Sequence, residues 1–346
     1  MKKSSMEIEI YEQPEIISNL LSCYISNSDI LIDLPKDAKK IVFVASGSSY
    51  HCARFAAELF GTIAKVEARA IYSSEFLLKA EVPHETNILY VFITQSGETS
   101  DTNKALTRAK ELGMTTLAIT NKKGSTIWNA ADYKIDCHAG EELSIAATKS
   151  LVSQLFCVTL MVLKYAQFKG VDISNYLLLL NKLPEDIRKS LSLHSDIKRI
   201  ATELASYNII VVTADGISYA FAKETSLKIK ETSYICTLSS ILGEFMHGHV
   251  AVLNNKSAQI HITLEDLSDN ATDNLSKIES DYNTPIYIIG SNTSSLSCKA
   301  NLDVKASSLI NKSFSILVIC QILALEIAKA LGRNVDKPHG LHKIVK

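Results

Sequence analysis

The sequence of 346 residues carries almost no net charge, because 36 Lys and Arg residues are matched by 37 Asp and Glu residues. A protein without a large positive field does not attract a nucleic-acid backbone, so we expect no nucleic-acid partner. Long apolar runs are also absent. The longest one, residues 151–163, is shorter than the roughly 20 residues that span a bilayer, and Ser153, Gln154 and Thr159 interrupt it. It predicts a buried core helix and no membrane partner.

The sequence shows no sign of export. Residues 1–5 are followed by the acidic Glu7 and Glu9 where a signal peptide would have an apolar run. The seven cysteines include no Cys-x-x-Cys pair, which favours reduced thiols and a cytoplasmic location.

Clusters of metal ligands are missing as well. Among nine histidines only two pairs lie close together, His247 with His249 and His339 with His342. No acidic or cysteine partner completes a set of ligands with either pair, so we expect no metal site. With 47% hydrophobic and 21% charged residues, the chain is typical of a folded globular protein, and its length indicates two domains.

Two hydroxyl-rich turns each follow a β-branched apolar run and precede a helix-like segment. Residues 46–49 (Ser-Gly-Ser-Ser) follow the run 41–44, and residues 94–99 (Thr-Gln-Ser-Gly-Glu-Thr) follow the run 89–93. A strand that ends in small residues and leads into a helix leaves backbone N–H groups free at the positive end of the helix dipole. Neither turn is a Walker loop or a Gly-x-Gly-x-x-Gly motif. We therefore predict that they hold the phosphate of a small molecule.

The chain repeats itself at an offset of about 168 residues. Residues 40–50 align with 208–219, and residues 93–101 align with 262–269. The second copy has Glu265 and Asp266 where an anion would lie, and these charges repel phosphate. Only the first copy is expected to bind it.

Within each copy strands alternate with helices, which predicts an α/β fold of two tandem domains, each a doubly wound, mostly parallel sheet flanked by helices. We place an N-terminal segment at 1–25, the first domain at 26–190, the second at 191–330 and a C-terminal tail at 331–346.

Glutamate, histidine and lysine side chains, which can serve as acids, bases and cations, gather in the second copy over residues 223–231 and 243–249. Lys228 lies four residues after Glu224 and three before Glu231, so the three share one face of a helix. From spacing alone, a solvated, salt-bridged surface is the commoner interpretation. His247, by itself, is equally compatible with an ordinary turn.

Several motifs together resemble the double sugar-isomerase (SIS) domain family, over nearly the whole chain. This family includes the isomerase half of glucosamine-6-phosphate synthase and the type II glucosamine-6-phosphate deaminases. The motifs that carry the resemblance are residues 9–14 (Glu-Ile-Tyr-Glu-Gln-Pro), the two turns, 139–142 with 146–150, 228–231, 243–248 and 336–343.

The resemblance implies a role for each matching residue. The sugar phosphate would be held by Ser49, Thr94, Gln95, Ser96 and Thr99, and the sugar would be contacted by Ser46, Glu142 and Ala147. The catalytic residues would be Glu231, His247, Lys228 and Lys343. Glu231 would move a proton between C1 and C2, His247 would open the pyranose ring, and Lys343 would lie on the closing tail.

Of four departures from the family pattern, those at Ala147 and Ser46 fall in the sugar pocket. Ala147 replaces the usual Ser of the synthase branch and Ser46 replaces Cys, while Thr94 keeps a hydroxyl and His249 stands at a usual Pro. The residue strings 146–150 and 336–343 resemble the deaminase branch more closely.

The chain starts directly before the SIS region, without the amidohydrolase domain of glutamine-using members. The resemblance therefore favours conversion of glucosamine 6-phosphate and water to fructose 6-phosphate and ammonia, with no cofactor. It also implies a homodimer with the site at the subunit interface. Two alternatives stay open: a related phosphosugar isomerase or a deglycase of phosphorylated Amadori sugars, and a non-catalytic sugar-phosphate sensor. Which hexosamine phosphate is used is left open.

Overall fold

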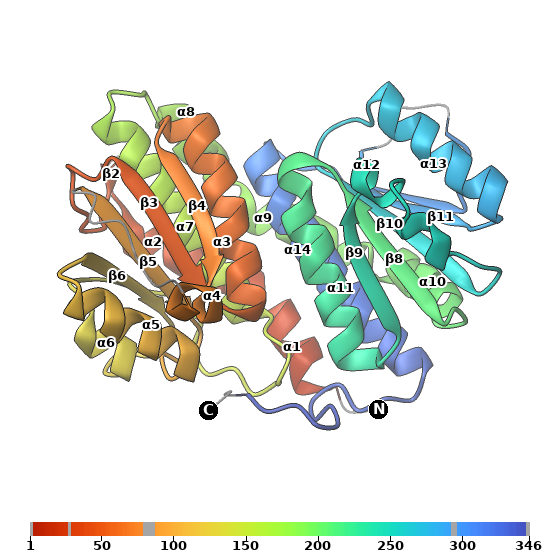
Figure 1. Cartoon of the computed structure of the whole chain (residues 1–346), viewed down its shortest axis with the longest axis horizontal. Helices are drawn as coiled ribbons and strands as arrows, with labels where there is room; N and C mark the ends of the chain where they lie inside the picture. The colour runs from red at the N-terminus through yellow and green to blue at the C-terminus, as the bar shows by residue number, and fades with distance from the viewer. Residues whose placement is uncertain (1–2, 27–28, 79–86, 292–295, 344–346) are drawn as a thin grey trace. The chain divides into compact units, whose positions relative to one another are not determined.

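The computed structural model describes residues 3–26, 29–78, 87–291 and 296–343. The chain forms two compact units, each built on one five-stranded sheet (Figure 1). The first-sheet unit comprises Glu15–Glu142, Lys149–Asn181 and His342–Lys346. The second-sheet unit comprises Met1–Pro14, Leu143–Thr148 and Lys182–Leu341.

The sheet of the first-sheet unit is parallel throughout, with the strand order β4-β3-β5-β6-β7. Its strands are β3 (Lys40–Ala45), β4 (Glu67–Tyr72), β5 (Ile88–Thr94), β6 (Thr115–Thr120) and β7 (Tyr133–Asp136). Every residue of β5 is buried, as expected for a central strand that is covered on both faces.

Successive residues of β3 serve opposite faces of this sheet. Val42 and Val44 belong to a core with residues of α4, α5 and α6. On the other face the Phe43 ring lies 5.8 Å from that of Phe60, which in turn lies 5.6 Å from the ring of Tyr165 on α7. Period-two alternation thus places helices on both sides of the sheet (Figure 1).

The remaining elements of the unit surround this sheet. They are α2 (Gln13–Tyr24), whose first two residues belong to the other unit, the short pair β1 (Ile25–Ser26) and β2 (Asp29–Ile30), α3 (Gly47–Leu59), the π-helix η1 (Phe60–Ala64), α4 (Ser73–Leu78), α5 (Ser100–Glu111), α6 (Thr126–Ala130), α7 (Lys149–Phe168) and α8 (Ser174–Leu180). The predicted core helix over 151–163 is confirmed, since nearly all of α7 is buried.

The second-sheet unit repeats the same topology, with the parallel order β9-β8-β10-β11-β12. Its strands are β8 (Ile209–Ala214), β9 (Cys236–Ile241), β10 (Ser257–Thr263), β11 (Ile286–Gly290) and β12 (Ala300–Asp303). β8 takes the place of β3, and β10 takes the place of β5. The repeat and the doubly wound parallel fold inferred from the sequence are confirmed.

The other elements of this unit are α1 (Ser5–Tyr11), α9 (Leu183–Ser192), α10 (His194–Leu204), the 3₁₀ turns η2 (Gly216–Ser218) and η3 (His249–Val252), α11 (Tyr219–Ser233), α12 (Leu242–Phe245), α13 (Asp269–Tyr282) and α14 (Leu309–Ala330). One apolar core joins the sheet to α12, η3 and α13. α11 contacts the other face and packs against α14.

Within the described ranges, α7 and α14 are long and apolar enough to cross a membrane. Both are mostly buried inside the protein, as core helices of globular domains are.

Candidate active site

The first hydroxyl turn lies where β3 ends and α3 begins. Ser46 is the N-cap residue in an extended conformation, yet its side chain forms no capping hydrogen bond in the described structure. Gly47 follows with a φ of 56°. Ser49, in the first turn of the helix, donates its hydroxyl to Oε1 of Gln154 on α7 at 2.9 Å. The side chain of Ser46 therefore does not cap α3, and the N-terminal end of such a helix is a place where an anion can bind.

The second turn has the same construction between β5 and α5. Thr94 is buried at the end of β5, and its hydroxyl lies 2.8 Å from that of Thr99. Thr99 is the N-cap residue of α5 and also forms no side-chain cap among the described residues. The carbonyl of Gln95 accepts from the amide of Asn121 at 3.1 Å, which fixes the turn to the strand beside it.

Gly97 determines the shape of this second turn. Its φ is 68°, and a Cβ there would lie 2.0 Å from Oγ of Ser125. Glu98 closes the turn because its carboxylate accepts from the amide and the hydroxyl of Thr126, at 2.9 and 2.7 Å. These hydrogen bonds lower the pKa of Glu98 below its ordinary value. Ser96 accepts from the amide of Glu98 at 3.1 Å.

Both turns lie at the same edge of one sheet. β3 and β5 are neighbours, with Ala45 opposite Ile93, so the turns leave the sheet side by side. The structure therefore brings the predicted phosphate-binding residues together. Their contact with a phosphate stays a prediction.

The corresponding edge of the second-sheet unit is acidic. A cavity of about 230 Å³ is lined there by Asp215, Glu265, Asp266 and His261, among others. Burial raises the pKa of Asp215. Because carboxylates repel phosphate, this geometry favours the prediction that only the first copy binds the anion.

The acid and base side chains of α11 are not a solvated surface, and that interpretation is wrong. Lys228 is only 1% exposed, and Glu224 is also buried. The ammonium of Lys228 lies 2.6 Å from Oε2 of Glu231 and 3.5 Å from Oε1 of Glu224. The side chain of Glu231 is 23% exposed, so this carboxylate is held by a buried cation and still reaches the surface.

His247 lies in the turn between α12 and η3 and is exposed. Within the part of the chain that the structure describes, no hydrogen bond or ion pair joins the side chain of His247 to that of Glu231. The structure thus places these two predicted catalytic side chains in one unit without a direct polar contact.

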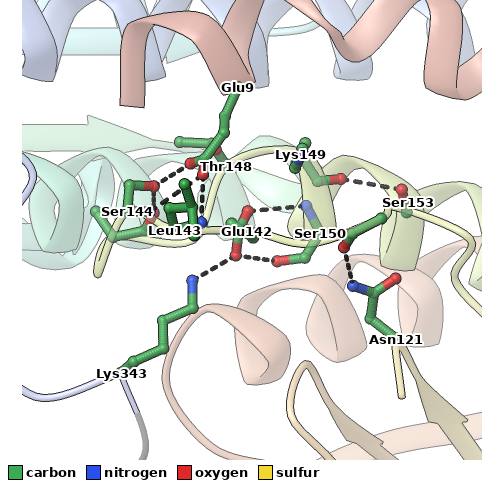
Figure 2. A network of polar contacts seen from close by, with 12 residues as sticks. Glu9, Asn121, Glu142, Leu143, Ser144, Thr148, Lys149, Ser150, Ser153 and Lys343 are labelled. Carbon is green, nitrogen blue, oxygen red and sulfur yellow. Dashed lines mark hydrogen bonds and ion pairs between the residues drawn. The ribbon is translucent and has the colours of Figure 1, made fainter. Parts of the chain in front are cut away.

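Glu142 and Lys343 form a pair that the sequence did not indicate (Figure 2). The buried carboxylate of Glu142 accepts from the amide of Ser150 at 3.0 Å and from its hydroxyl at 2.7 Å. Its Oε2 atom also lies 2.7 Å from the ammonium of Lys343. Ala147 is also predicted to contact the sugar. It is partly buried and belongs to the segment 143–148, which directly follows Glu142 in the sequence.

Sequence reasoning missed two side chains that shape these sites. In the sequence, Gln154 is only an interruption of an apolar run. A polar side chain in a buried helix needs a hydrogen-bond partner, and this signal could have pointed to its contact with Ser49. Glu9 was part of a motif without an assigned role. Its carboxylate accepts from the amide of Ser144 at 3.1 Å.

Fold and turns together define a duplicated α/β protein in which one copy has two hydroxyl-rich turns at the same edge of its sheet. The SIS domain model matches residues 36–164 and 203–326, and the chain belongs to this family. Curated relatives include the glutamine–fructose-6-phosphate aminotransferases (isomerizing) of Aquifex aeolicus, 29% identical over 99% of this chain and 58% of the relative, and of Methanocaldococcus jannaschii, 35% identical over 97% of this chain and 30% of the relative. The chain thus spans between about a third and three fifths of the length of these relatives.

Solved structures show the same fold. The C-terminal domain of glucosamine-fructose-6-phosphate aminotransferase from Francisella tularensis matches with a TM-score of 0.91 and 24% identity, covering 97% of this chain and 99% of the other. Glucosamine-6-phosphate deaminase from Thermotoga maritima matches with a TM-score of 0.77 and 20% identity, covering 99% of each chain.

Proposed function

We propose that this protein is an aminosugar-phosphate deaminase and isomerase, which converts glucosamine 6-phosphate and water to fructose 6-phosphate and ammonia. The observation that carries the proposal is the pair of Lys228 and Glu231, a buried ammonium 2.6 Å from a carboxylate that remains partly exposed. Such a carboxylate is held in one position by its cation and is still accessible to a substrate. This is what a base for carbon-bound protons requires.

The two turns of the first-sheet unit would hold the phosphate. Among the described residues, the N-cap side chains of their helices α3 and α5 form no capping hydrogen bond, so phosphate oxygens would accept from the N-terminal ends of both helices and from the hydroxyl of Thr99. The hydroxyl of Ser49 would join them by exchanging its hydrogen bond to Gln154 for one to the phosphate. Both turns belong to the copy that lacks the acidic residues of the other. The affinity for phosphate supplies binding energy remote from the reacting carbons.

In the proposed reaction His247 transfers a proton between the ring oxygen and the anomeric hydroxyl, which opens the pyranose to the aldehyde. Glu231 then removes the proton from C2, the electron pair forms the C1–C2 double bond of an enolamine, and the C1=O π pair moves to the oxygen, which takes a proton from water. The same carboxyl returns the proton to C1, and the iminium formed at C2 loses an N–H proton to water to give the imine. Water adds to this imine and ammonia leaves, so the atoms of substrate and water are all found in the two products.

Lys343 is proposed to act from the C-terminal tail. Its pairing with Glu142 fixes an ammonium that can interact with the sugar oxygens as charge develops. We also propose a homodimer as the active form, in keeping with the family resemblance, and a cytoplasmic location.

A second candidate is the isomerase reaction without ammonia release, because the curated relatives reported above are aminotransferases named as isomerizing. The same C1–C2 proton transfer serves both reactions. In the deaminase reaction the nitrogen leaves the sugar as ammonia. In the isomerase reaction no ammonia is released, either because another source donates the nitrogen or because the substrate contains none.

The test is a panel of hexose and hexosamine phosphates in which ammonia and ketose phosphate are measured together. We expect both products from glucosamine 6-phosphate in equal amounts, and a loss of at least about 100-fold in kcat for Glu231→Gln. Glu185→Gln, which changes an exposed carboxylate on α9, is the matched control and should leave kcat unchanged.

Turnover of other sugar phosphates without ammonia would replace the deaminase proposal by the isomerase. Tight binding of sugar phosphates without any turnover would support a sensor. A Glu231→Gln variant with the wild-type rate would refute the assignment of the base.

A further inference from the structure

The carboxylate of Glu9 on helix α1 collects hydrogen bonds from one irregular segment, residues 143–148 (Figure 2). It accepts from the amides of Leu143 and Ser144 and from the hydroxyl of Ser144. The hydroxyl of Thr148 lies 3.5 Å from the same carboxylate. Glu9 is only 3% exposed, so these donors replace its water shell.

The segment 143–148 has neither helix nor strand structure. Its backbone amides therefore obtain no partners from a regular ladder, and side chains must supply them. Gln321 contributes one further contact, from its Nε2 to the carbonyl of Thr148 at 3.2 Å. The segment holds Ala147 and directly follows Glu142, two residues assigned above to the sugar pocket.

Helix α1 has a second anchor at its other end. The carboxylate of Asp336 accepts from the amides of Ser5 and Met6, at 2.8 and 3.0 Å. Asp336 begins the stretch of the tail that leads to Lys343, and the amide of His339 in that stretch donates to the hydroxyl of Tyr234 at 2.6 Å. One short helix therefore contacts both segments that carry proposed sugar-contacting groups.

We propose that Glu9 is a positioning residue of the active site, and that α1 holds the segment 143–148 and the base of the C-terminal tail at fixed places. This inference rests on the proposed function for its effect on turnover. Hydrogen bonds to an ionised carboxylate are the strong ones, so a neutral replacement loosens the segment without emptying the phosphate turns. A displacement of about 1 Å at a reacting group can lower turnover about 100-fold.

The experiment compares Glu9→Ala and Glu9→Gln with Glu7→Gln as the control. Glu7 lies on the same helix and pairs with Lys329 at 2.7 Å, so its replacement also removes a carboxylate and its polar contact from α1 but leaves the segment 143–148 untouched. The readouts are kcat, KM, the Kd for inorganic phosphate, and hydrogen exchange of the amides at 143–148 in the full-length protein.

For Glu9→Ala we expect kcat to fall about 10- to 100-fold, with the Kd for phosphate within about twofold of wild type. Exchange at 143–148 should accelerate by at least about tenfold, since two of these amides lose their acceptor. Glu9→Gln should recover part of both effects, because its amide oxygen still accepts. Glu7→Gln should change neither.

Wild-type kcat together with wild-type exchange in Glu9→Ala would overturn the inference, and so would an equal loss of kcat in Glu7→Gln. If the wild-type protein turns over no sugar phosphate, the proposed function fails first. In that case, amide hydrogen exchange in Glu9→Ala still tests whether Glu9 anchors the segment. Acceleration confined to residues 143–148 supports this role, and unchanged exchange refutes it.

Discussion

Replacing Gly97 by Ala should weaken phosphate binding by deforming the second hydroxyl turn. An alanine Cβ would lie 2.0 Å from Oγ and 2.4 Å from Cβ of Ser125, and the backbone has a φ of 68° that L-residues disfavour. The left-handed conformation costs about 1–2 kcal/mol, and overpacking adds about 1–3 kcal/mol. We therefore expect a total loss of about 2–5 kcal/mol in the free energy of unfolding of the first-sheet unit.

Gly124→Ala separates the two contributions. Gly124 has a similar φ of 77°, but a Cβ there would meet no heavy atom within 4 Å. This control should lose only about 1–2 kcal/mol, and its phosphate affinity should be unchanged. Because the single tryptophan, Trp128 on α6, belongs to the first-sheet unit, its fluorescence during urea denaturation reports on the relevant unit.

Binding is measured by titration calorimetry with inorganic phosphate. If the turn shifts to relieve the contact with Ser125, the Kd of Gly97→Ala should rise about tenfold or more, since each 1.4 kcal/mol of lost binding energy is a factor of ten. The same stability for both glycine variants, with an unchanged Kd, would show that the turn tolerates a side chain and does not shape the phosphate site.

Two further predictions concern the second-sheet unit. Burial lowers the pKa of His261 to about 4, below the value of about 6.5 for an exposed histidine, so the unfolded state binds more protons between these values. The contribution of the neutral His261 to the free energy of unfolding is complete above pH 6.5 and is lost as the pH falls toward 4. Between pH 7.5 and 5, the free energy of unfolding of the wild type should fall by about 2 kcal/mol more than that of His261→Gln. Urea denaturation followed by circular dichroism measures both values. An equal pH dependence of both proteins would contradict this. Lys228→Met leaves the buried carboxylate of Glu224 without its cation and should cost about 3–5 kcal/mol, whereas adding Glu224→Gln should restore most of the stability. A double variant as unstable as the single one would show that packing, and not charge, explains the loss.

Local sequence patterns were sufficient for much of the fold. The uncharged runs at 41–44 and 89–93 predict buried parallel strands because both faces of such strands are covered, and they became β3 and β5. The repeat at a fixed offset predicted two similar sheets, and β8 and β10 occupy the places of β3 and β5.

Charge and exposure of the site residues were harder to predict. Spacing placed Lys228 on one helix face with its acidic partners, but it favoured a solvated surface. The burial of this face follows from the packing of α11 against α14, a contact between segments about 90 residues apart in the chain. Periodicity within one helix carries no information about which distant element covers it.

The amino-acid sequence by itself determined the strands, the two glycine-containing turns and the presence of Glu265 and Asp266 in the second copy, because each depends on neighbours within a few residues. Only the tertiary structure decided that Glu9 meets the segment 143–148, that Gln154 meets Ser49, and that Glu142 meets Lys343. These pairs are 105 to 201 residues apart in the chain. Such contacts depend on where the chain returns after folding, which no local pattern specifies.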